Sequence, residues 1–232
     1  FTATLSTNST SGDLTLNTVK AAALVIANNG TTAGSDILDS GVLTVSGTSS
    51  FTTAVSDGVI TLDSTNVFSE AVTLNTNSSS TSANVTVENG TTALIIAQST
   101  VGGNLTLISG AAAGITDSGA VTVSGNLVAT TDDNSGVIDL DQTTVAGTVS
   151  LNTNGSGNAT FDNGTSNLDL AASTVGGDLA VTSGNGITDS GVITVVGTSL
   201  FTSDVAGKVI TLDETNAMTG AVSISHTGAA DV

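Results

Sequence analysis

The chain has 232 residues, of which only 9% are charged and 2% are aromatic, and it contains no proline, cysteine or tryptophan. Its formal net charge is −18, and Lys20 and Lys208 are the only lysine or arginine residues. A surface of this charge repels nucleic acid, and no stretch approaches the ~20 apolar residues of a membrane span, so we expect neither nucleic-acid binding nor membrane insertion of this segment.

Two apolar residues around one small, usually polar, residue form a pattern that recurs along the whole chain. Alternation with period two places both apolar side chains on one face, which predicts short strands with one buried side. No window has convincing helical spacing. The predicted strands, in chain order, are 14–16, 43–45, 60–62, 72–74, 85–87, 105–107, 121–123, 138–140, 149–151, 179–181, 193–195, 210–212 and 222–224.

A nine-residue phrase beginning Ile-x-Asp-Ser-Gly occurs three times, at 37–45, 115–123 and 187–195. A phrase that returns along the chain in this way indicates similar units stacked along one axis. We expect one continuous solenoid over 1–232. Its modules are 1–36 (partial), 37–114, 115–186 and 187–232 (partial).

The spacing of the strands permits either a meander of hairpins or a coil. Small interior residues and the long repeat favour the coil, because a sandwich core of this length normally recruits aromatic anchors. Modules of about 75 residues would then hold about three coils each, and the whole chain would form a rod ~50 Å long. The distance from Ala27 to Ile37 is shorter than that from Ala97 to Ile115, which predicts the loss of one strand near the beginning.

Three motifs resemble the repeat regions of giant bacterial surface proteins of the filamentous-haemagglutinin type, including autotransporter-type adhesins. They are the Ile-Thr-Asp-Ser-Gly run at 115–125, Ser-Thr-Val-Gly-Gly-Asn-Leu at 99–105 and Gly-x-Val-Ile-Thr-Leu-Asp at 207–213. The resemblance spans essentially the whole chain. It implies a right-handed parallel β-helix that is exported to the cell surface and serves in adhesion, cell contact or extracellular filaments. It carries over no binding or catalytic residue.

Calcium is the first candidate ligand, because carboxylates that converge can bind it. Asp39, Asp117 and Asp189 share one repeat position, and Asp63, Asp141 and Asp213 share another. Copies of one position are a full module apart, ~14 Å along the axis, so one ion could not bridge them. We expect turn or solvated aspartates, no cofactor, and only a weak possibility of Ca²⁺.

Carbohydrate binding or cleavage by a β-helix is the alternative function. Glycoside hydrolysis needs two carboxylates at a set separation, and Asp132 with Asp133, or Asp139 with Asp141, could be proposed. The chain has few aromatic or basic residues to hold a sugar. We therefore expect a corner for the first pair, outward strand positions for the second, no catalytic residues and no enzyme.

Three remaining features carry weaker hypotheses. His226 is a single histidine in an outward-looking stretch, so we expect it to be exposed. The sequons at Asn8, Asn84 and Asn158 are expected by chance in a chain this rich in Asn and Thr. Ice-binding solenoids display Thr-x-Thr rows, whereas this chain displays one outward Thr in each strand, as any exposed β-face prefers.

The sequence thus predicts a structural repeat segment of a secreted bacterial cell-surface fibre or adhesin. It would act as a stiff extracellular rod. Its partners would be copies of itself or adjoining repeats of a longer chain, with a host or neighbouring cell surface as a further possible partner. Neither end of the chain has an evident cap, so we expect further repeats or end-to-end association.

Overall fold

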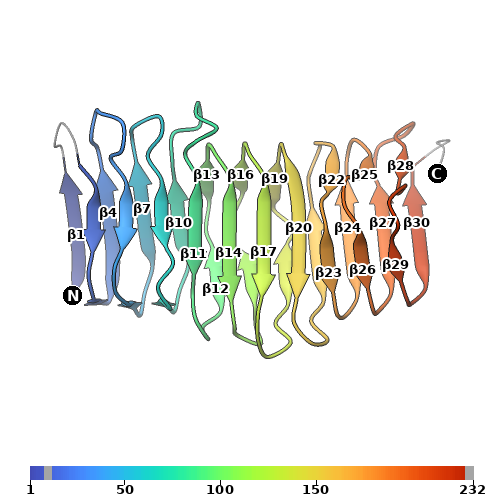
Figure 1. Cartoon of the computed structure of the whole chain (residues 1–232), viewed down its shortest axis with the longest axis horizontal. Helices are drawn as coiled ribbons and strands as arrows, with labels where there is room; N and C mark the ends of the chain where they lie inside the picture. Colours follow the sequence, from blue (N-terminus) through green and yellow to red (C-terminus); the bar gives the residue numbers. More distant parts are fainter. Residues whose placement is uncertain (8–11, 228–232) are drawn as a thin grey trace.

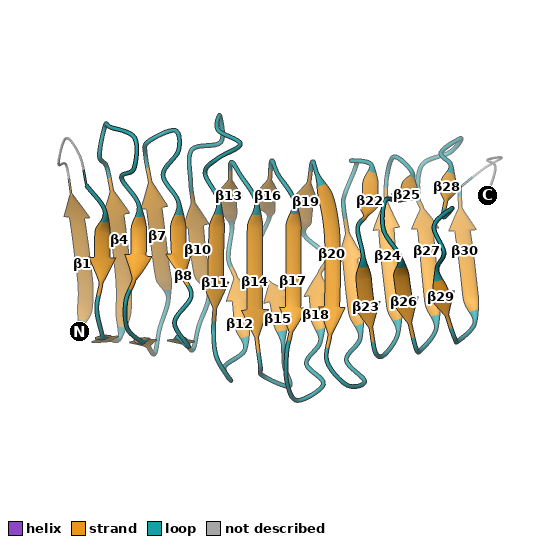
Figure 2. Ribbon diagram, viewed as in Figure 1, coloured by secondary structure: helices purple, strands orange, loops and turns teal. Residues whose placement is uncertain are grey.

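The computed structural model of the chain describes residues 1–7 and 12–227, and these contain thirty strands and no helix (Figure 2). The first ten strands are β1 (Thr2–Thr7), β2 (Leu14–Leu16), β3 (Val19–Ala21), β4 (Ala23–Asn28), β5 (Ile37–Asp39), β6 (Leu43–Val45), β7 (Ser49–Thr53), β8 (Ile60–Leu62), β9 (Val67–Phe68) and β10 (Val72–Asn75). The next ten are β11 (Val85–Glu88), β12 (Leu94–Ile96), β13 (Ser99–Val101), β14 (Leu105–Ser109), β15 (Ile115–Asp117), β16 (Val121–Val123), β17 (Leu127–Thr131), β18 (Ile138–Leu140), β19 (Thr143–Val145) and β20 (Thr148–Thr153). The last ten are β21 (Ala159–Asp162), β22 (Leu168–Leu170), β23 (Ser173–Val175), β24 (Leu179–Ser183), β25 (Ile187–Asp189), β26 (Ile193–Val195), β27 (Ser199–Ser203), β28 (Ile210–Thr211), β29 (Ala217–Met218) and β30 (Val222–His226).

The strands stack into a parallel β-solenoid of about 10 turns, with the two ends of the chain at opposite ends of the stack (Figure 1). Sheet A has 14 strands, sheet B has 13, and a small sheet C contains β3, β6 and β9. Each described pair is parallel, and the partners are about one coil apart in sequence, as Val85 is from Leu105. Hairpins would give antiparallel pairs. The all-β solenoid prediction is therefore confirmed, while the handedness stays a prediction.

The core is a set of columns of inward side chains that run along the axis. Leu105, Leu127 and Val149 form one such column across β14, β17 and β20, and each is at most 1% exposed. Phe51 and Phe68 meet edge to face inside the first coils, with ring centroids 5.7 Å apart. These columns join all the coils into one continuous apolar cluster.

Each set of ten strands repeats one pattern, which we call a block. Four straight strands alternate with three split sides, each made of two short strands around a bend. One straight strand and one split side complete a coil, so a block makes three and a half coils. The straight strands consequently lie in sheet A in the first block, in sheet B in the second, and in sheet A again in the third.

No strand is missing near the beginning of the chain. β4 (Ala23–Asn28) occupies the position that β14 occupies in the second block, and β5 follows it as β15 follows β14. The predicted loss of a strand is therefore wrong. What the first block lacks is one residue in the corner after β3: two residues separate Ala21 from Leu24, the first buried residue of β4, whereas three separate Val101 from Leu105, the first buried residue of β14.

The first and last strands leave open sheet edges. Among the described residues, β1 pairs only with β4, and β30 pairs only with β27. Inward positions are consequently exposed at both edges, with Leu5 at 42% and Ile224 at 40%. Unpaired strand edges of this kind are surfaces to which another chain or another coil can add.

Candidate functional site

In each of the three copies of the Ile-x-Asp-Ser-Gly phrase, the aspartate accepts hydrogen bonds from the next coil. Asp39 Oδ1 accepts the N–H of Asp63 at 3.1 Å, and its Oδ2 accepts Nδ2 of Asn66 at 2.7 Å. Asn66 Oδ1 in turn accepts the N–H of Leu43 at 2.8 Å. Asp39 thus satisfies backbone and side-chain donors of the coil above it, which is a structural task.

The other copies of the phrase make corresponding bonds. Asp189 accepts the N–H of Asp213 at 2.9 Å and Nδ2 of Asn216 at 2.5 Å. Asp117 accepts the N–H of Gln142 at 3.0 Å and the hydroxyl of Thr143 at 2.7 Å through Oδ2. The other oxygen of Asp117, Oδ1, is buried without a hydrogen-bond partner in the described part of the chain.

The two aspartate positions are neighbours in successive coils. Consecutive copies of one position lie on different sheets, since Asp39 is in sheet B and Asp117 in sheet A. Asp63, by contrast, lies one coil above Asp39 and donates its N–H to it. Within residues 1–7 and 12–227, no group of three or more His, Cys, Asp or Glu side chains could hold a metal ion.

Two carboxylates along these edges, Asp117 and Glu88, have raised pKa values. Burial raises the pKa of Asp117 despite its two hydrogen bonds, and the charge of Asp141 raises it further. Burial likewise raises the pKa of Glu88, together with the charges of Asp132 and Asp63. Burial first, and repulsion from neighbouring carboxylates second, therefore disfavour the charged forms of Asp117 and Glu88 at neutral pH.

Of the two carboxylate pairs proposed for catalysis, Asp132, Asp133 and Asp139 occupy the predicted kinds of position, whereas Asp141 lies in the turn after β18 and not on a strand. Asp132 and Asp133 are exposed in the turn after β17, where Asp133 Oδ1 accepts the N–H of Asn134 at 2.7 Å. With Glu88 they line an open depression. Asp139 lies outward on β18, and Asp141 is exposed directly after it. The structure places neither pair around an enclosed cavity.

His226 is not an exposed outward residue, so that prediction is wrong. It pairs with the buried Ser203 in the parallel register of β27 and β30, which places it on the inward side. Its Nδ1 is buried without a hydrogen-bond partner among the described residues. The alternation of β30, with Ile224 inward over Phe201, fixes this orientation.

The asparagines of two sequons begin ladders that the sequence analysis did not anticipate. Asn84 Oδ1 accepts the N–H of Asn104 at 2.8 Å, and Asn104 does the same for Asn126. Asn158 accepts the N–H of Asp178 at 2.8 Å in the third block. The sequon at Asn8 lies entirely outside the described residues.

Glycines run beside this ladder because successive coils touch there. The N–H of Gly125 donates to the carbonyl of Gly103 at 3.0 Å, and Gly147 donates to Gly125 at the same distance. A Cβ on Gly125 would lie 2.5 Å from Asn104 Oδ1. The Gly-Asn pairs in the sequence were the signal for this column.

Specific side-chain hydrogen bonds join the first block to the second. Where β13 begins after its bend, Ser99 Oγ accepts the N–H of Leu74 at 2.9 Å and donates to the carbonyl of Ala97. The N–H of Gly102 donates to Thr76 Oγ1 at 2.9 Å. Side-chain hydroxyls therefore complete the backbone hydrogen bonding where a straight strand meets a split side.

The buried Asn89 closes the other half of this boundary. Its Oδ1 accepts the N–H of Phe68 at 2.7 Å, and its Nδ2 donates to the carbonyl of Phe68 at 3.0 Å. The amide thus replaces the strand that would continue sheet C. We call the bonds of Asn89, Ser99 and Gly102 the junction contacts.

The second boundary repeats each junction contact. Asn163 bonds to the N–H of Val145 at 2.7 Å and to its carbonyl at 3.1 Å. Ser173 Oγ accepts the N–H of Leu151 at 3.1 Å. The N–H of Gly176 donates to Thr153 Oγ1 at 2.9 Å. The Ser-Thr-Val-Gly-Gly motif is therefore the part of the second and third blocks that receives the block before it.

These boundaries coincide with a known repeat. The family described as "Repeats of unknown function (DUF5649)" matches residues 2–75, 82–152 and 156–225. The chain belongs to this family. Each match covers one block of ten strands to within one residue of its end, so one family repeat corresponds to three and a half coils. The repeats are framed differently from the predicted modules that begin at Ile37. Searches of curated proteins and of solved structures found no match.

Proposed function

We propose that this chain is a structural repeat segment of a secreted bacterial cell-surface fibre or adhesin. Uninterrupted parallel sheets and one continuous core through all three repeats are the observation that carries this proposal. Hydrogen bonds that run along the axis resist bending and stretching. The side chains with the most specific geometry, those of the junction contacts, hold the repeats together.

The proposed location is the cell exterior, and the proposed partners are adjoining repeats of a longer chain. The charge of −18 supports an expectation of no nucleic-acid binding. Within the described residues, no helix is long and apolar enough to cross a membrane. The role of anchor or receptor-binding module would fall to other parts of such a fibre.

Electron microscopy of the purified chain tests the rod. We expect particles of one width whose length corresponds to about 10 turns at ~4.8 Å each. Compact globules would contradict the proposal. Protease accessibility on intact cells that express the parent protein tests the location, because a surface fibre is cleaved or antibody-labelled without lysis.

The alternative of a carbohydrate-binding or carbohydrate-cleaving β-helix is tested on the same protein with a glycan array and a hydrolase screen. We expect no specific retention and no product. Saturable binding that is lost when Asp132 and Asp133 are both changed to Asn would favour the alternative over a purely structural role.

A further inference from the structure

Two internal junctions with the same contacts provide a template for the open edges at the ends of the chain. The first coil of a repeat supplies the buried asparagine, the serine and the corner glycine. The last coil of the repeat before it supplies two backbone amides, one backbone carbonyl and a threonine hydroxyl. Each open edge can therefore be compared with the template position by position.

The N-terminal edge lacks every side chain that the template requires. The register places Thr7 where the second repeat has Asn89, and Val19 where it has Ser99. The corner after β3 has one residue fewer, so Gly102 has no counterpart. A preceding repeat placed beneath β1 to β3 would find no partner for its backbone groups.

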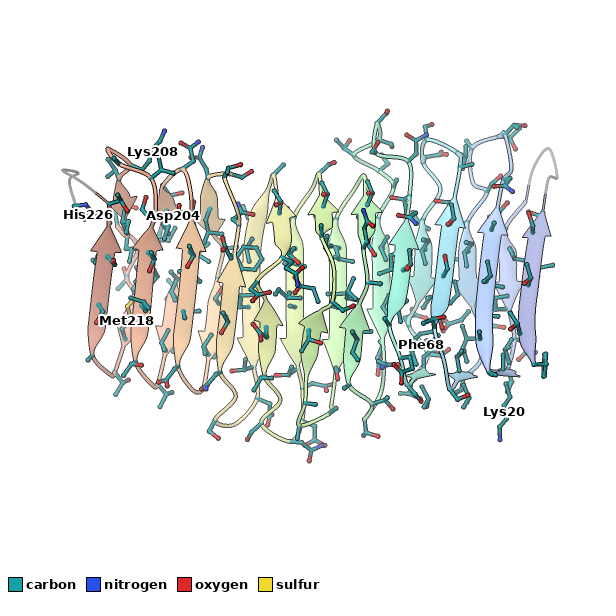
Figure 3. All side chains as sticks on the ribbon, turned by 180° about the vertical axis from the view of Figure 1, so that it is seen from behind. Lys20, Phe68, Asp204, Lys208, Met218 and His226 are labelled. Carbon is teal, nitrogen blue, oxygen red and sulfur yellow. The ribbon has the colours of Figure 1, made fainter. Side chains whose placement is uncertain are left out.

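The C-terminal edge retains what the template requires of a last coil. Met218 holds the position of Phe68, and Ile224 that of Leu74, so their backbone groups point to the free edge. Figure 3 shows Met218 and His226 at this end of the stack, and Lys20 near the other.

His226 occupies the position of the junction threonine Thr76. In each internal junction that hydroxyl accepts the N–H of the corner glycine. Nδ1 of His226 is buried and has no hydrogen-bond partner among the described residues. In the tautomer protonated at Nε2, Nδ1 is an acceptor without a donor in the described part of the chain, and a docking repeat would have to uncover it before the glycine N–H could reach it.

We propose that the C-terminal edge formed by β28, β29 and β30 is a docking surface for the first coil of another repeat of this family. The repeat that fits carries the buried asparagine and the Ser-Thr-Val-Gly-Gly sequence, as residues 82–152 do. The first repeat of a second copy of this chain does not fit. Association of repeats is therefore polar, and the cell-surface role plays no part in it.

Transplanting the missing side chains to the N-terminal edge tests this docking. The transplanted variant combines Thr7→Asn and Val19→Ser with Ala22→Gly and one further glycine inserted after residue 22. The measurement is light scattering after size exclusion over a concentration series at pH 7. We expect the wild-type chain to stay at 22.4 kDa. We expect the transplanted variant to associate at concentrations at least about tenfold lower, into end-to-end particles.

Ile224→Pro in the transplanted variant is the matched control. Proline removes the N–H that the serine would bind, and an edge strand tolerates it. We expect this variant to stay monomeric. Equal association of wild-type and transplanted chains would overturn the proposal, as would a transplanted variant that has the circular dichroism of the wild type and stays monomeric.

Copying the N-terminal edge into the first internal junction provides a second test, which does not depend on folding of the transplanted variant. The variant combines Asn89→Thr, Ser99→Val and deletion of Gly102. Hydrogen exchange should then be at least about tenfold faster at the amides of Phe68 and Leu74.

The second junction of the same molecule is the internal control. The amides of Val145 and Leu151 should keep their protection, because Asn163 and Ser173 still bind them. If Phe68 and Leu74 stay as protected as Val145 and Leu151, the junction contacts do not hold repeats together and the docking proposal fails.

Discussion

Single residues in this solenoid either fill a column or satisfy the backbone of a neighbouring coil. Leu127 illustrates the first role, because it lies between Leu105 and Val149 and is 1% exposed. Asp117 illustrates the second, with one oxygen bonded to the next coil and the other buried without a partner in the described structure. The two roles predict different responses to substitution.

Leu127→Ala should lower the free energy of unfolding by about 2–5 kcal/mol, because it removes buried methyl groups and leaves a cavity that stacked strands cannot close. Urea denaturation followed by circular dichroism measures the change. Val128→Ala alters the adjacent outward position and should cost less than about 1 kcal/mol. Similar losses for both variants would contradict the assignment of the column.

The raised pKa values predict greater stability at mildly acidic pH. For Asp117 and Glu88 the pKa of the folded state lies above that of the unfolded state. Their stabilising contribution is therefore complete below the unfolded pKa and is lost as the pH rises through the folded pKa. Asp178 has a lowered pKa because the backbone and hydroxyl of Thr198 bond to it, so its contribution has the opposite sign.

The melting temperature should consequently rise as the pH falls from 7 toward 5, since more carboxylates have raised than lowered pKa values among the shifts assigned here. Asp117→Asn should raise the melting temperature at pH 7 and diminish the rise, because the amide keeps an acceptor without a charge. Scanning calorimetry measures both. A melting temperature that falls between pH 7 and pH 5 would show that the charged carboxylates are not disfavoured in the folded state.

At the scale of elements, the corners and split sides determine how coils meet. The Gly103, Gly125 and Gly147 column allows backbones to touch, and the asparagine ladder beside it satisfies their N–H groups. Asn89 does the same for the end of sheet C. These side chains hold polar backbone groups that no strand covers.

Gly125→Ala should destabilise the chain by about 1–3 kcal/mol, because the new Cβ would lie 2.7 Å from the carbonyl of Gly103 and the coils must separate. Ser124→Ala, at the exposed preceding position, is the control and should be within about 0.5 kcal/mol of the wild type. Chemical denaturation compares the two. A neutral Gly125→Ala would mean that the coils can move apart freely at this corner.

Asn89→Ala should cost about 2–5 kcal/mol, since it leaves the buried N–H and carbonyl of Phe68 without partners. Faster hydrogen exchange at Phe68 distinguishes this local effect from general loosening. Asn77→Ala, at a partly exposed position in the loop after β10, provides a control of the same chemistry and should have little effect.

Each strand that the sequence predicted has two apolar residues around a small one, but β12 and β22, whose inward residues are also both apolar, were not predicted. Leu105 to Leu107 and Ile193 to Val195 are strands as expected. β7 was not predicted, because the inward residues at its two ends are Ser49 and Thr53, which are polar. Thr53 is polar for a structural reason, since its hydroxyl donates to the carbonyl of Gly58 in the next turn.

The junction contacts were also not predicted from the sequence. Ser-Thr-Val-Gly-Gly was visible as a motif, but its meaning depends on which strand lies beneath it. That strand, β10, is 24 residues away at the point where Val72 meets Ile96. A pattern within one window cannot show that Ser99 faces the N–H of Leu74.

At the scale of the whole molecule, negative charge is spread along a rod with open ends. The isoelectric point is about 4.1. At neutral pH the charge keeps copies apart sideways, whereas protonation near pH 4 removes this repulsion.

Turbidity should therefore rise sharply near pH 4 and fall again on return to pH 7. Electron microscopy at pH 4 should show particles that grow in width at constant length, because lateral contact depends on charge and end contact on the junction side chains. Growth in length alone at pH 4 would contradict this separation of the two kinds of association.

A repeat of three and a half coils also determines which way a rod faces. The straight strands change sides at every repeat, so the first and third repeats present like surfaces in one direction and the second presents its own in the opposite direction. Adding one repeat to such a rod would turn whatever is fused to its tip through half a revolution, and adding two would turn it back. Whether the number of repeats is odd or even would thus set the direction in which the tip faces, and the number itself would set the length of the rod.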